Sequence, residues 1–183
     1  MIGRRPVHDR SILDALEAID PEPFAGGVWR VTRKGRDALR GSTANGRWSP
    51  SGGEFEVLYT SLERAGALAE IGYRLSLEPV WPSRVEHEVH LIEVETARTL
   101  RFANLKSLAP LGVEIERYHT FEYRATQAIA AAAYFLEFDS LMVPSARFRC
   151  QNLVIFTERA TGLVLRKSQA VDWDTWRGQR VGD

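Results

Sequence analysis

Residues 57–76 read VLYTSLERAGALAEIGYRLS, a stretch in which a strand-like run of apolar residues gives way to the apolar spacing of a helix. Residues 57–60 combine aliphatic, aromatic and β-branched side chains in a short run that is typical of a strand. From Leu62 onward, apolar and small side chains recur at the spacing of a helix, and Thr60 or Ser61 stands where a helix cap is expected. A strand that leads directly into a helix predicts a domain that mixes both kinds of element.

The sequence on both sides of this stretch favours a mixed α+β fold with a central sheet and at least three helices. The flanking helices are predicted over residues 9–19, which end before Pro21 and Pro23, and over the alanine-rich residues 123–138. Residues 98–119 show no regular period. Further strands are predicted at residues 28–32, 86–96, 141–143, 152–158 and, after a hairpin turn at Gly162, 163–171.

The length and composition are those of a single globular domain. The chain has 183 residues, of which 44% are hydrophobic and 26% charged, so it can bury a core without metals or disulfides. We expect one domain over residues 1–183, in which residues 1–24 form an N-terminal helix and linker. Lys plus Arg and Asp plus Glu number 24 each, and this zero net charge disfavours a general nucleic-acid binder.

The cysteine and histidine content argues against several kinds of site. Cys150 is the single cysteine, so the sequence has no intrachain disulfide and no cysteine-based zinc site. The four histidines form no zinc motif, and their spacing puts His87 and His90 on opposite faces of a strand, as structural residues. The N-terminus has no long apolar run and no segment approaches the length of a membrane span, so we expect a cytoplasmic protein with no membrane partner.

The long polar segment 33–56 is the clearest candidate for a functional loop, because segments of this length without regular structure are often functional in compact domains. It carries Arg47 and Trp48 at the centre of ANGRWSP, among residues that usually form turns. The arginine fork could hold a phosphate beside a planar base, or it could form a cation–π pair that fixes the loop. The loop sequence alone leaves both interpretations open.

Four other polar residues lie in or beside apolar segments, and each has a structural alternative. Arg30 interrupts the strand VWRVT, where an arginine can simply face solvent, and Tyr59 can be a core residue of its strand. Glu70 lies among apolar helix residues, and its spacing from Arg74 favours an exposed i,i+4 ion pair. Ser145 follows a buried strand, as hydroxyls of active sites and of turns both do. No GxSxG, GxGxxG or P-loop motif is present.

The order of these features resembles the RES-domain family, which is named for its Arg, Glu and Ser. The resemblance covers residues 28–172. The family's loop usually reads closer to GGRWNP, so this chain departs from it at Asn45 and Ser49. The matching motifs are VWR (Arg30), NGRWSP (Arg47 and Trp48), LYTS (Tyr59), ALAEI (Glu70) and VPSAR (Ser145).

The resemblance implies a fold, a substrate and a partner. RES proteins resemble ADP-ribosyltransferases, with a mixed sheet and flanking helices. They are toxins of two-gene systems, paired with an antitoxin that carries an Xre-like helix-turn-helix. Their substrate is NAD+, which some members destroy by hydrolysis or phosphorolysis and one branch uses to ADP-ribosylate a metabolic enzyme. The resemblance implies no metal and no direct contact with nucleic acid.

The resemblance also implies roles that fit the chemistry of NAD+. Arg30 and Arg47 would bind its pyrophosphate through charge-assisted hydrogen bonds, and Trp48 would pack the loop in place rather than stack on a base. Glu70 would stabilise the oxocarbenium-like ribosyl cation that forms as the nicotinamide bond breaks.

Three residues are implied at the nicotinamide end of the substrate. Tyr59 would stack on nicotinamide, and Ser145 would hydrogen-bond the nicotinamide amide or a ribose hydroxyl. Asn152 is a further candidate for NAD+ binding, with a structural role at a strand edge as the alternative. With Glu70 and Arg30, Tyr59 and Ser145 make up the predicted catalytic set.

Three functions remain open at this point. The first is a growth-arresting toxin that cleaves NAD+ as a glycohydrolase or phosphorylase, and the second is a protein ADP-ribosyltransferase that uses the same site. The third is a non-catalytic interaction domain whose Arg and Glu residues only form ion pairs. Leu68 occupies the position, two before Glu70, where transferases of this fold often carry a second acid. This favours a small acceptor such as water or phosphate.

Overall fold

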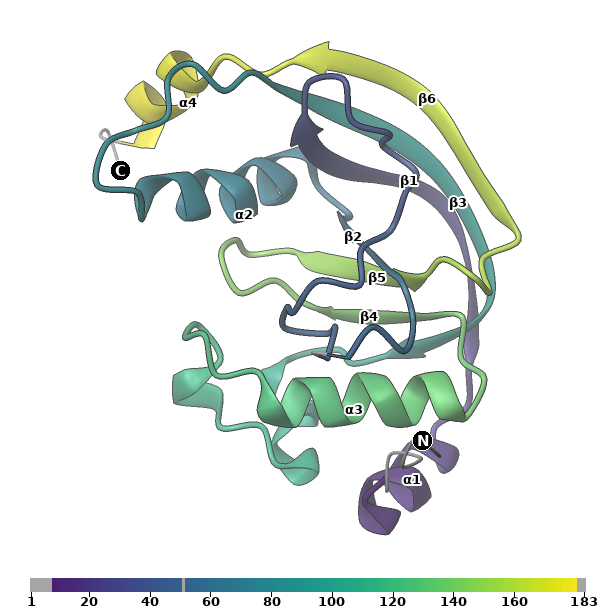
Figure 1. Ribbon diagram of the computed structural model, residues 1–183. Coiled ribbons are helices and arrows are strands. Elements are labelled where there is room, and N and C mark those ends of the chain that lie inside the picture. Colours follow the sequence, from purple (N-terminus) through teal and green to yellow (C-terminus); the bar gives the residue numbers. More distant parts are fainter. Residues whose placement is uncertain (1–7, 51, 181–183) are drawn as a thin grey trace, which may run out of the picture.

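The computed structural model describes residues 8–50 and 52–180, which form a mixed α+β fold of one curved sheet with helices on it (Figure 1). None of the helices among these residues is long and apolar enough to cross a bilayer. The helices are α1 (Arg10–Glu17), α2 (Arg64–Ser76), α3 (Arg124–Phe135) and α4 (Trp173–Arg180). The strands are β1 (Glu22–Arg33), β2 (Val57–Ser61), β3 (His87–Arg101), β4 (Ser140–Pro144), β5 (Gln151–Phe156) and β6 (Gly162–Ala170).

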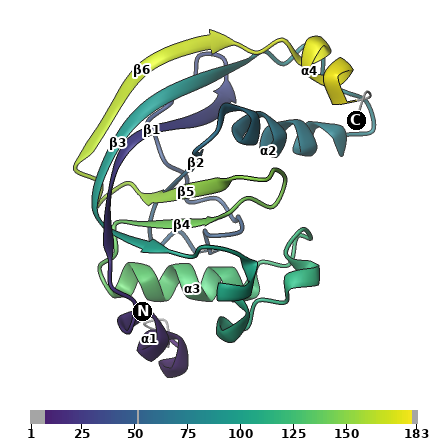
Figure 2. The same cartoon turned by 180° about the vertical axis from the view of Figure 1, so that it is seen from behind.

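The six strands lie in the order β1-β2-β5-β4-β3-β6. In addition, β1 pairs directly with β3, although three strands separate them in this order. The long strand β3 makes this possible, because different parts of it face different neighbours. Its first part pairs antiparallel with β1 and β6, while its last residues, 99–101, pair parallel with β4. Figure 2 shows β1, β3 and β6 arching together over the shorter strands.

Two groups of helices cover the sheet at different places. Helices α1 and α3 pack together below β4, where Leu16 and Ile129 join a large apolar cluster (Figure 1). Helix α2 lies in the hollow under the arch of β1, β3 and β6, and α4 lies above it. The buried side chains of Leu68, Val89 and Trp173 join α2, β3 and α4 in one cluster. Helix α2 is therefore held between the sheet and the C-terminal helix.

The structure confirms the mixed α+β class and most of the predicted elements, but it extends two strands. Strand β1 begins at Glu22 rather than at residue 28, and it pairs with β3 along its whole length. A register shift at Pro23 accommodates the residue that cannot donate a ladder hydrogen bond. Strand β3 continues to Arg101, into the segment 98–119 that shows no period in the sequence. The rest of that segment contains three short 3-10 helices between residues 105 and 117.

Two other predictions about elements were wrong, and one element was missed. The turn at Gly162 does not form a hairpin with β5, because β6 pairs with β3 instead. Helix α4 was not predicted at all. Neither Thr60 nor Ser61 caps α2: both belong to β2, and the cap position is Glu63, whose side chain makes no capping hydrogen bond. Ser61 Oγ instead accepts the backbone N–H of Glu63 at 3.4 Å.

Candidate functional site

The RW sequence forms the tip of a tight turn, and its two side chains point to opposite environments. Gly46 and Ser49 exchange backbone hydrogen bonds of 2.9 and 3.2 Å, which leaves Arg47 and Trp48 as the two central residues. Trp48 is 2% exposed and belongs to the core, so it packs the loop in place. Its backbone N–H donates to the Tyr59 hydroxyl at 3.0 Å. A Cβ at Gly46 would lie 2.7 Å from that hydroxyl, which explains the glycine.

Helix α3 holds this turn from the other side. Gln127 Nε2 lies within hydrogen-bond distance of three acceptors in the loop, namely Asn45 Oδ1, Gly46 O and Ser49 O. The hydroxyl of Thr126 donates to Arg47 O at 2.6 Å. The loop backbone is thus fixed by two adjacent residues of a helix, which places the Arg47 side chain reproducibly.

The Arg47 guanidinium lies between aromatic rings. Its Cζ is 4.6 Å from the ring centre of Tyr118 and 5.0 Å from that of Tyr123, and Nη2 donates to Thr120 O at 3.3 Å. The Nη1 atom is buried and has no hydrogen-bond partner among the described residues. Burial lowers the pKa of Arg47, but an arginine still remains charged. The structure therefore confirms the cation–π interpretation of Arg47, and phosphate binding by this residue stays a prediction.

Glu70 is fixed by two side chains that come from the far end of the sequence. Its Oε1 accepts hydrogen bonds from Ser145 Oγ at 2.8 Å and from Asn152 Nδ2 at 3.1 Å. The expected ion pair with Arg74 is absent from the described part of the chain. The spacing argument failed because α2 turns this face toward strands β4 and β5 rather than toward solvent, where two better-placed donors compete for the carboxylate.

Ser145 lies behind Glu70 rather than on the surface of the cavity. Its hydroxyl accepts the backbone N–H groups of Arg147 and Phe148, both at 3.2 Å, and directs its own proton to Glu70. Asn152 does line the cavity, and its Oδ1 is buried without a hydrogen-bond partner among the described residues. These two residues orient the carboxylate that the site presents.

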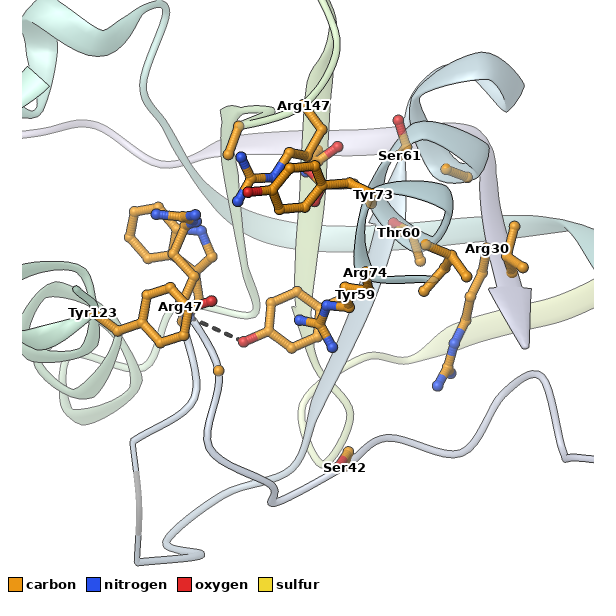
Figure 3. A pocket seen from close by; sticks show the side chains of 18 of the residues that line it. Arg30, Ser42, Arg47, Tyr59, Thr60, Ser61, Tyr73, Arg74, Tyr123 and Arg147 are labelled. Atoms are coloured by element: carbon orange, nitrogen blue, oxygen red, sulfur yellow. Dashed lines mark hydrogen bonds between the residues drawn. The ribbon is translucent and has the colours of Figure 1, made fainter. Parts of the chain in front are cut away.

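Arg30 lies on the opposite side of the cavity from Arg47, with Tyr59 and Arg74 between them (Figure 3). Arg30 Nη1 donates to Ala38 O at 2.9 Å and to Arg40 O at 2.8 Å, so it anchors the long loop after β1. Burial lowers the pKa of Arg30. Because part of its guanidinium is already bound to the loop, pyrophosphate binding by Arg30 stays a prediction.

Tyr59 lines the cavity as the one half-buried residue of β2, whose other four residues are buried. Burial raises the pKa of its phenol to about 12, so the hydroxyl is neutral at physiological pH. That hydroxyl is occupied by the Trp48 N–H, which leaves the ring face as the part of Tyr59 that a ligand can contact.

These residues surround one cavity of about 270 Å³. This volume lies near the lower end of small-molecule pockets, which hold roughly 300–1,000 Å³, so a dinucleotide would extend from it toward the surface. Four arginines and one carboxylate line the cavity, which leaves a formal charge of +3. The charged lining residues are Arg30, Arg47, Glu70, Arg74 and Arg147. The cavity is suited to an anion that also carries flat rings.

The sequence did not point to several residues that the structure brings to this cavity. Tyr118 and Tyr123 lie on or beside the irregular segment, where no periodicity marks a side chain as buried or exposed. Arg147 stacks on the ring of Tyr73, with its Cζ 3.5 Å from the ring centre (Figure 3). The proximity of Arg147 to Ser145 in VPSAR was the one available signal. Among the described residues no group of His, Cys, Asp or Glu is arranged to hold a metal ion.

The two strand histidines lie away from this cavity and are hydrogen-bonded within the sheet. His90 contacts the hydroxyls of Thr32 and Ser168, both at 2.8 Å. His87 Nδ1 lies 3.1 Å from the indole nitrogen of Trp173, whose N–H it accepts when unprotonated, and 3.1 Å from Val85 O, to which it donates when protonated. Both histidines are therefore structural, as their spacing predicted.

Comparison with known proteins identifies relatives along most of the chain. The sequence profile described as "RES domain" matches residues 27–177. The chain is 23% identical over 175 residues to "NAD(+) phosphorylase MbcT" of Mycobacterium bovis, which covers 90% of this chain and 91% of that protein. It is 30% identical over 118 residues to "Probable NAD(+) phosphorylase Rv3189" of Mycobacterium tuberculosis, covering 64% of this chain and 56% of that protein.

A solved structure has the same fold. The match is a chain in the crystal structure of the M. tuberculosis MbcT–MbcA toxin–antitoxin complex, with a TM-score of 0.82 and 22% sequence identity. It covers 94% of this chain and 98% of that chain. The arrangement of sheet and helices described above is therefore shared over nearly the whole length of both proteins.

Proposed function

Because the chain belongs to the RES domain family, we propose that it is the toxin of a toxin–antitoxin pair and consumes NAD+ by breaking the nicotinamide–ribose bond. Two relatives are named as NAD(+) phosphorylases, and the matching solved structure is a toxin–antitoxin complex. The resemblance seen in the sequence motifs is confirmed by the family match. The activity would deplete cytoplasmic NAD+ and arrest growth.

The observation that carries this proposal is the position of Glu70. It is the single carboxylate on a cavity wall that otherwise carries arginines, and two hydrogen bonds to one oxygen fix its orientation. Loss of nicotinamide leaves positive charge on the ribose carbon. A carboxylate that is already oriented stabilises this charge without reorganising during the reaction. The same carboxylate would not be needed to bind a pyrophosphate, so its presence favours catalysis over simple binding.

The remaining lining residues can be assigned to parts of NAD+. Arg47, which lines the cavity, would bind the pyrophosphate through its positive charge, with Arg30 contributing from the opposite wall. The exposed ring face of Tyr59 would stack on nicotinamide. Asn152, which lines the cavity beside Glu70, would contribute to NAD+ binding mainly by holding the Glu70 carboxylate in place. Ser145 would act through Glu70 rather than by touching the substrate.

A protein ADP-ribosyltransferase is the second candidate, and the finer fold that we propose, an ADP-ribosyltransferase-like one, would suit it. The target would be a metabolic enzyme. One observation weighs against it: Leu68, two positions before Glu70, is 5% exposed and packed in the cluster under α2. No acid is available there to activate a protein side chain. We therefore favour a small acceptor over a protein acceptor.

The proposed partner is an antitoxin that carries an Xre-like helix-turn-helix. The cavity wall offers apolar surface for such a contact, since Phe121 is 56% exposed. Phe121 also lines the cavity. A partner bound at this wall would control access to the site without unfolding the toxin.

The direct test is incubation of the purified protein with NAD+, followed by chromatography for free nicotinamide. The proposed toxin releases nicotinamide in proportion to enzyme and time. Addition of the product of the neighbouring gene, if it is the antitoxin, should stop the release. A folded protein that leaves NAD+ intact over a range of phosphate concentrations would instead favour the non-catalytic interaction domain.

A further inference from the structure

Phe121 presents an exposed aromatic ring to the cavity. Of the large hydrophobic side chains that are exposed within residues 8–50 and 52–180, it alone lines the cavity, and it is 56% exposed. It lies in the irregular segment directly before α3. A lone exposed ring is ordinary on a protein surface, but this ring continues a series of aromatic side chains that leads into the cavity.

Three aromatic rings and two guanidinium groups form this series. The ring centre of Phe121 lies 6.2 Å from that of Tyr123 and 6.5 Å from that of Tyr73. Arg47 Cζ lies 5.0 Å from the Tyr123 ring centre, and Arg147 Cζ lies 3.5 Å from that of Tyr73. All five side chains line the cavity. Proteins bind planar nucleobases on surfaces of this kind, on which aromatic rings and arginine planes offer flat faces.

The order of these groups along the wall follows the order of groups in NAD+. Glu70 is assigned to the nicotinamide ribose and Arg47 to the pyrophosphate, and Phe121 comes next to Arg47 through the ring of Tyr123. The cavity volume of about 270 Å³ is too small to enclose a dinucleotide. The nucleotide farthest from Glu70 must therefore rest on a surface that is open to solvent, as Phe121 is.

We propose that the ring of Phe121 is the surface on which the adenine base of NAD+ stacks. This inference rests on the proposed function and names the residue that recognises the second nucleotide of the substrate. Adenine would lie flat on the exposed face of the ring, with its edge toward Arg147. Both partners would then remove apolar area from water.

The charge beside Phe121 distinguishes between the two ring systems of NAD+. Arg147 Cζ lies 6.0 Å from the ring centre of Phe121. The nicotinamide ring of NAD+ is a cation, which Arg147 would repel at this position. Adenine is neutral and carries acceptor nitrogens at its edge. Among the described residues, Arg147 makes one side-chain hydrogen bond, to His119 O, so further donors of its guanidinium are available for these acceptors.

The proposed stacking should act on affinity rather than on the chemical step. Adenine is separated by the pyrophosphate from the bond that breaks, so its contact with Phe121 is the same in the bound substrate and in the transition state. Such uniform binding lowers KM and leaves kcat unchanged. The same contact should be made by ADP-ribose, which carries adenine and pyrophosphate but no nicotinamide.

The test compares Phe121→Ala and Phe121→Trp with Phe135→Ala, using protein from cell-free synthesis. Phe135 is a phenylalanine of similar exposure, 59%, at the end of α3 and outside the cavity lining. ADP-ribose and inorganic pyrophosphate are titrated calorimetrically into each protein. We expect Phe121→Ala to weaken ADP-ribose binding by roughly tenfold or more, with pyrophosphate binding unchanged, because only the stacked base is lost. Phe121→Trp, which keeps a flat ring, and Phe135→Ala should both bind ADP-ribose as the wild type does.

This measurement separates the inference from the proposed function. Selective loss of ADP-ribose binding in Phe121→Ala supports the adenine assignment even if the wild type releases no nicotinamide. An unchanged affinity for ADP-ribose would overturn the assignment, whatever the rate of NAD+ cleavage, and so would an equal loss of pyrophosphate binding. Where NAD+ is cleaved, Phe121→Ala should raise its KM by the same factor. A loss in kcat instead would place Phe121 at the reacting nicotinamide ring and also overturn the assignment.

Discussion

Ser145 Oγ lies 2.8 Å from Glu70 Oε1, although the two residues are 75 positions apart in the chain. Because the serine hydroxyl accepts two backbone N–H groups of its own turn, its proton is available only to the carboxylate. The turn after β4 therefore sets the direction of a side chain on α2. Asn152, from β5, donates to the same oxygen. The other oxygen, Oε2, accepts no hydrogen bond from the described residues.

Replacing Glu70 by Gln should lower the rate of nicotinamide release by roughly a hundredfold or more, as happens when a preorganised electrostatic group is removed. NAD+ affinity should change much less, because the carboxylate acts on charge that develops in the transition state. Turnover and melting temperature are measured together. Glu63→Gln, at the exposed start of the same helix, is the matched control and should behave as the wild type. A Glu70→Gln protein within threefold of wild-type turnover would remove Glu70 from the reaction.

The two donors to Glu70 should act as a unit. Ser145→Ala and Asn152→Ala each remove one hydrogen bond to Oε1, and each should reduce kcat for nicotinamide release by about tenfold, since a charge-assisted bond is worth roughly 1.5–3 kcal/mol. The double variant should approach Glu70→Gln. In a Glu70→Gln background, further loss of either donor should have little effect on kcat. Full additivity in that background would show that Ser145 and Asn152 act independently of the carboxylate.

The contact between His87 and Trp173 should make the fold sensitive to acid. Burial lowers the pKa of His87 below its usual value of 6.5, so the unfolded chain binds more protons than the folded one below that pH. The free energy of unfolding should therefore fall as pH decreases through this range. Protonated Nδ1 can no longer accept the indole N–H, which should loosen α4. Thermal melts between pH 7.5 and 5 measure the effect.

Trp173→Phe provides the comparison for this pH effect. It keeps an aromatic ring against the histidine but lacks the indole donor, so the dependence of melting temperature on pH should be shallower. Trp81→Phe changes the neighbouring ring, which packs edge-to-face on Trp173 without a hydrogen bond to His87, and should retain the wild-type slope. Equal slopes in Trp173→Phe and the wild type would exclude the indole contact as the acid-sensitive link.

Gly72 should be required for the docking of α4 on α2. A Cβ at this position would lie 2.1 Å from the Trp176 ring, so Gly72→Ala must displace α4 or shift α2. We expect a loss of stability of about 1–3 kcal/mol, the usual cost of overpacking. The cost of Gly72→Ala should largely vanish in a Trp176→Ala background, where the clash is absent. Denaturant unfolding of the wild type and the three variants of this cycle gives the answer, and an undiminished cost would point to another cause.

Local periodicity was enough to predict the class of the fold and most of its elements. The strand at residues 57–60 and the helix after it appear almost as their hydrophobic periods indicated. Pairings over long distances were not predictable in this way. The partner of β6 is decided by how β3 curves, and the edge that β3 presents depends on residues throughout the sheet. Residues 22–27 contain proline and glycine, and only pairing with β3 makes them a strand.

The candidate site shows the same limit. The motif order brought Arg47, Tyr59 and Glu70 to attention, and the structure gathers all three at one cavity. The hydrogen-bond partners and neighbouring rings of each residue could not be predicted from the sequence. An i,i+4 spacing suggested that Glu70 pairs with Arg74, but Glu70 instead accepts hydrogen bonds from β5 and from the turn after β4. The rings beside Arg47 come from a segment without periodicity, so no pattern could assign them.

The hydrogen bonds from α3 to the turn that carries Arg47 determine where inactivating mutations can arise. Gln127 and Thr126 never reach the cavity lining, yet their hydrogen bonds to residues 45–49 decide where the Arg47 side chain stands. A genetic selection for cells that survive the toxin therefore samples α3 as well as the motif residues. If the proposed function is correct, escape alleles at these two positions would yield protein that is still folded and still able to bind the proposed antitoxin. Mutations in α3 could thus inactivate such a protein while all the motif residues that identify the family remain unchanged.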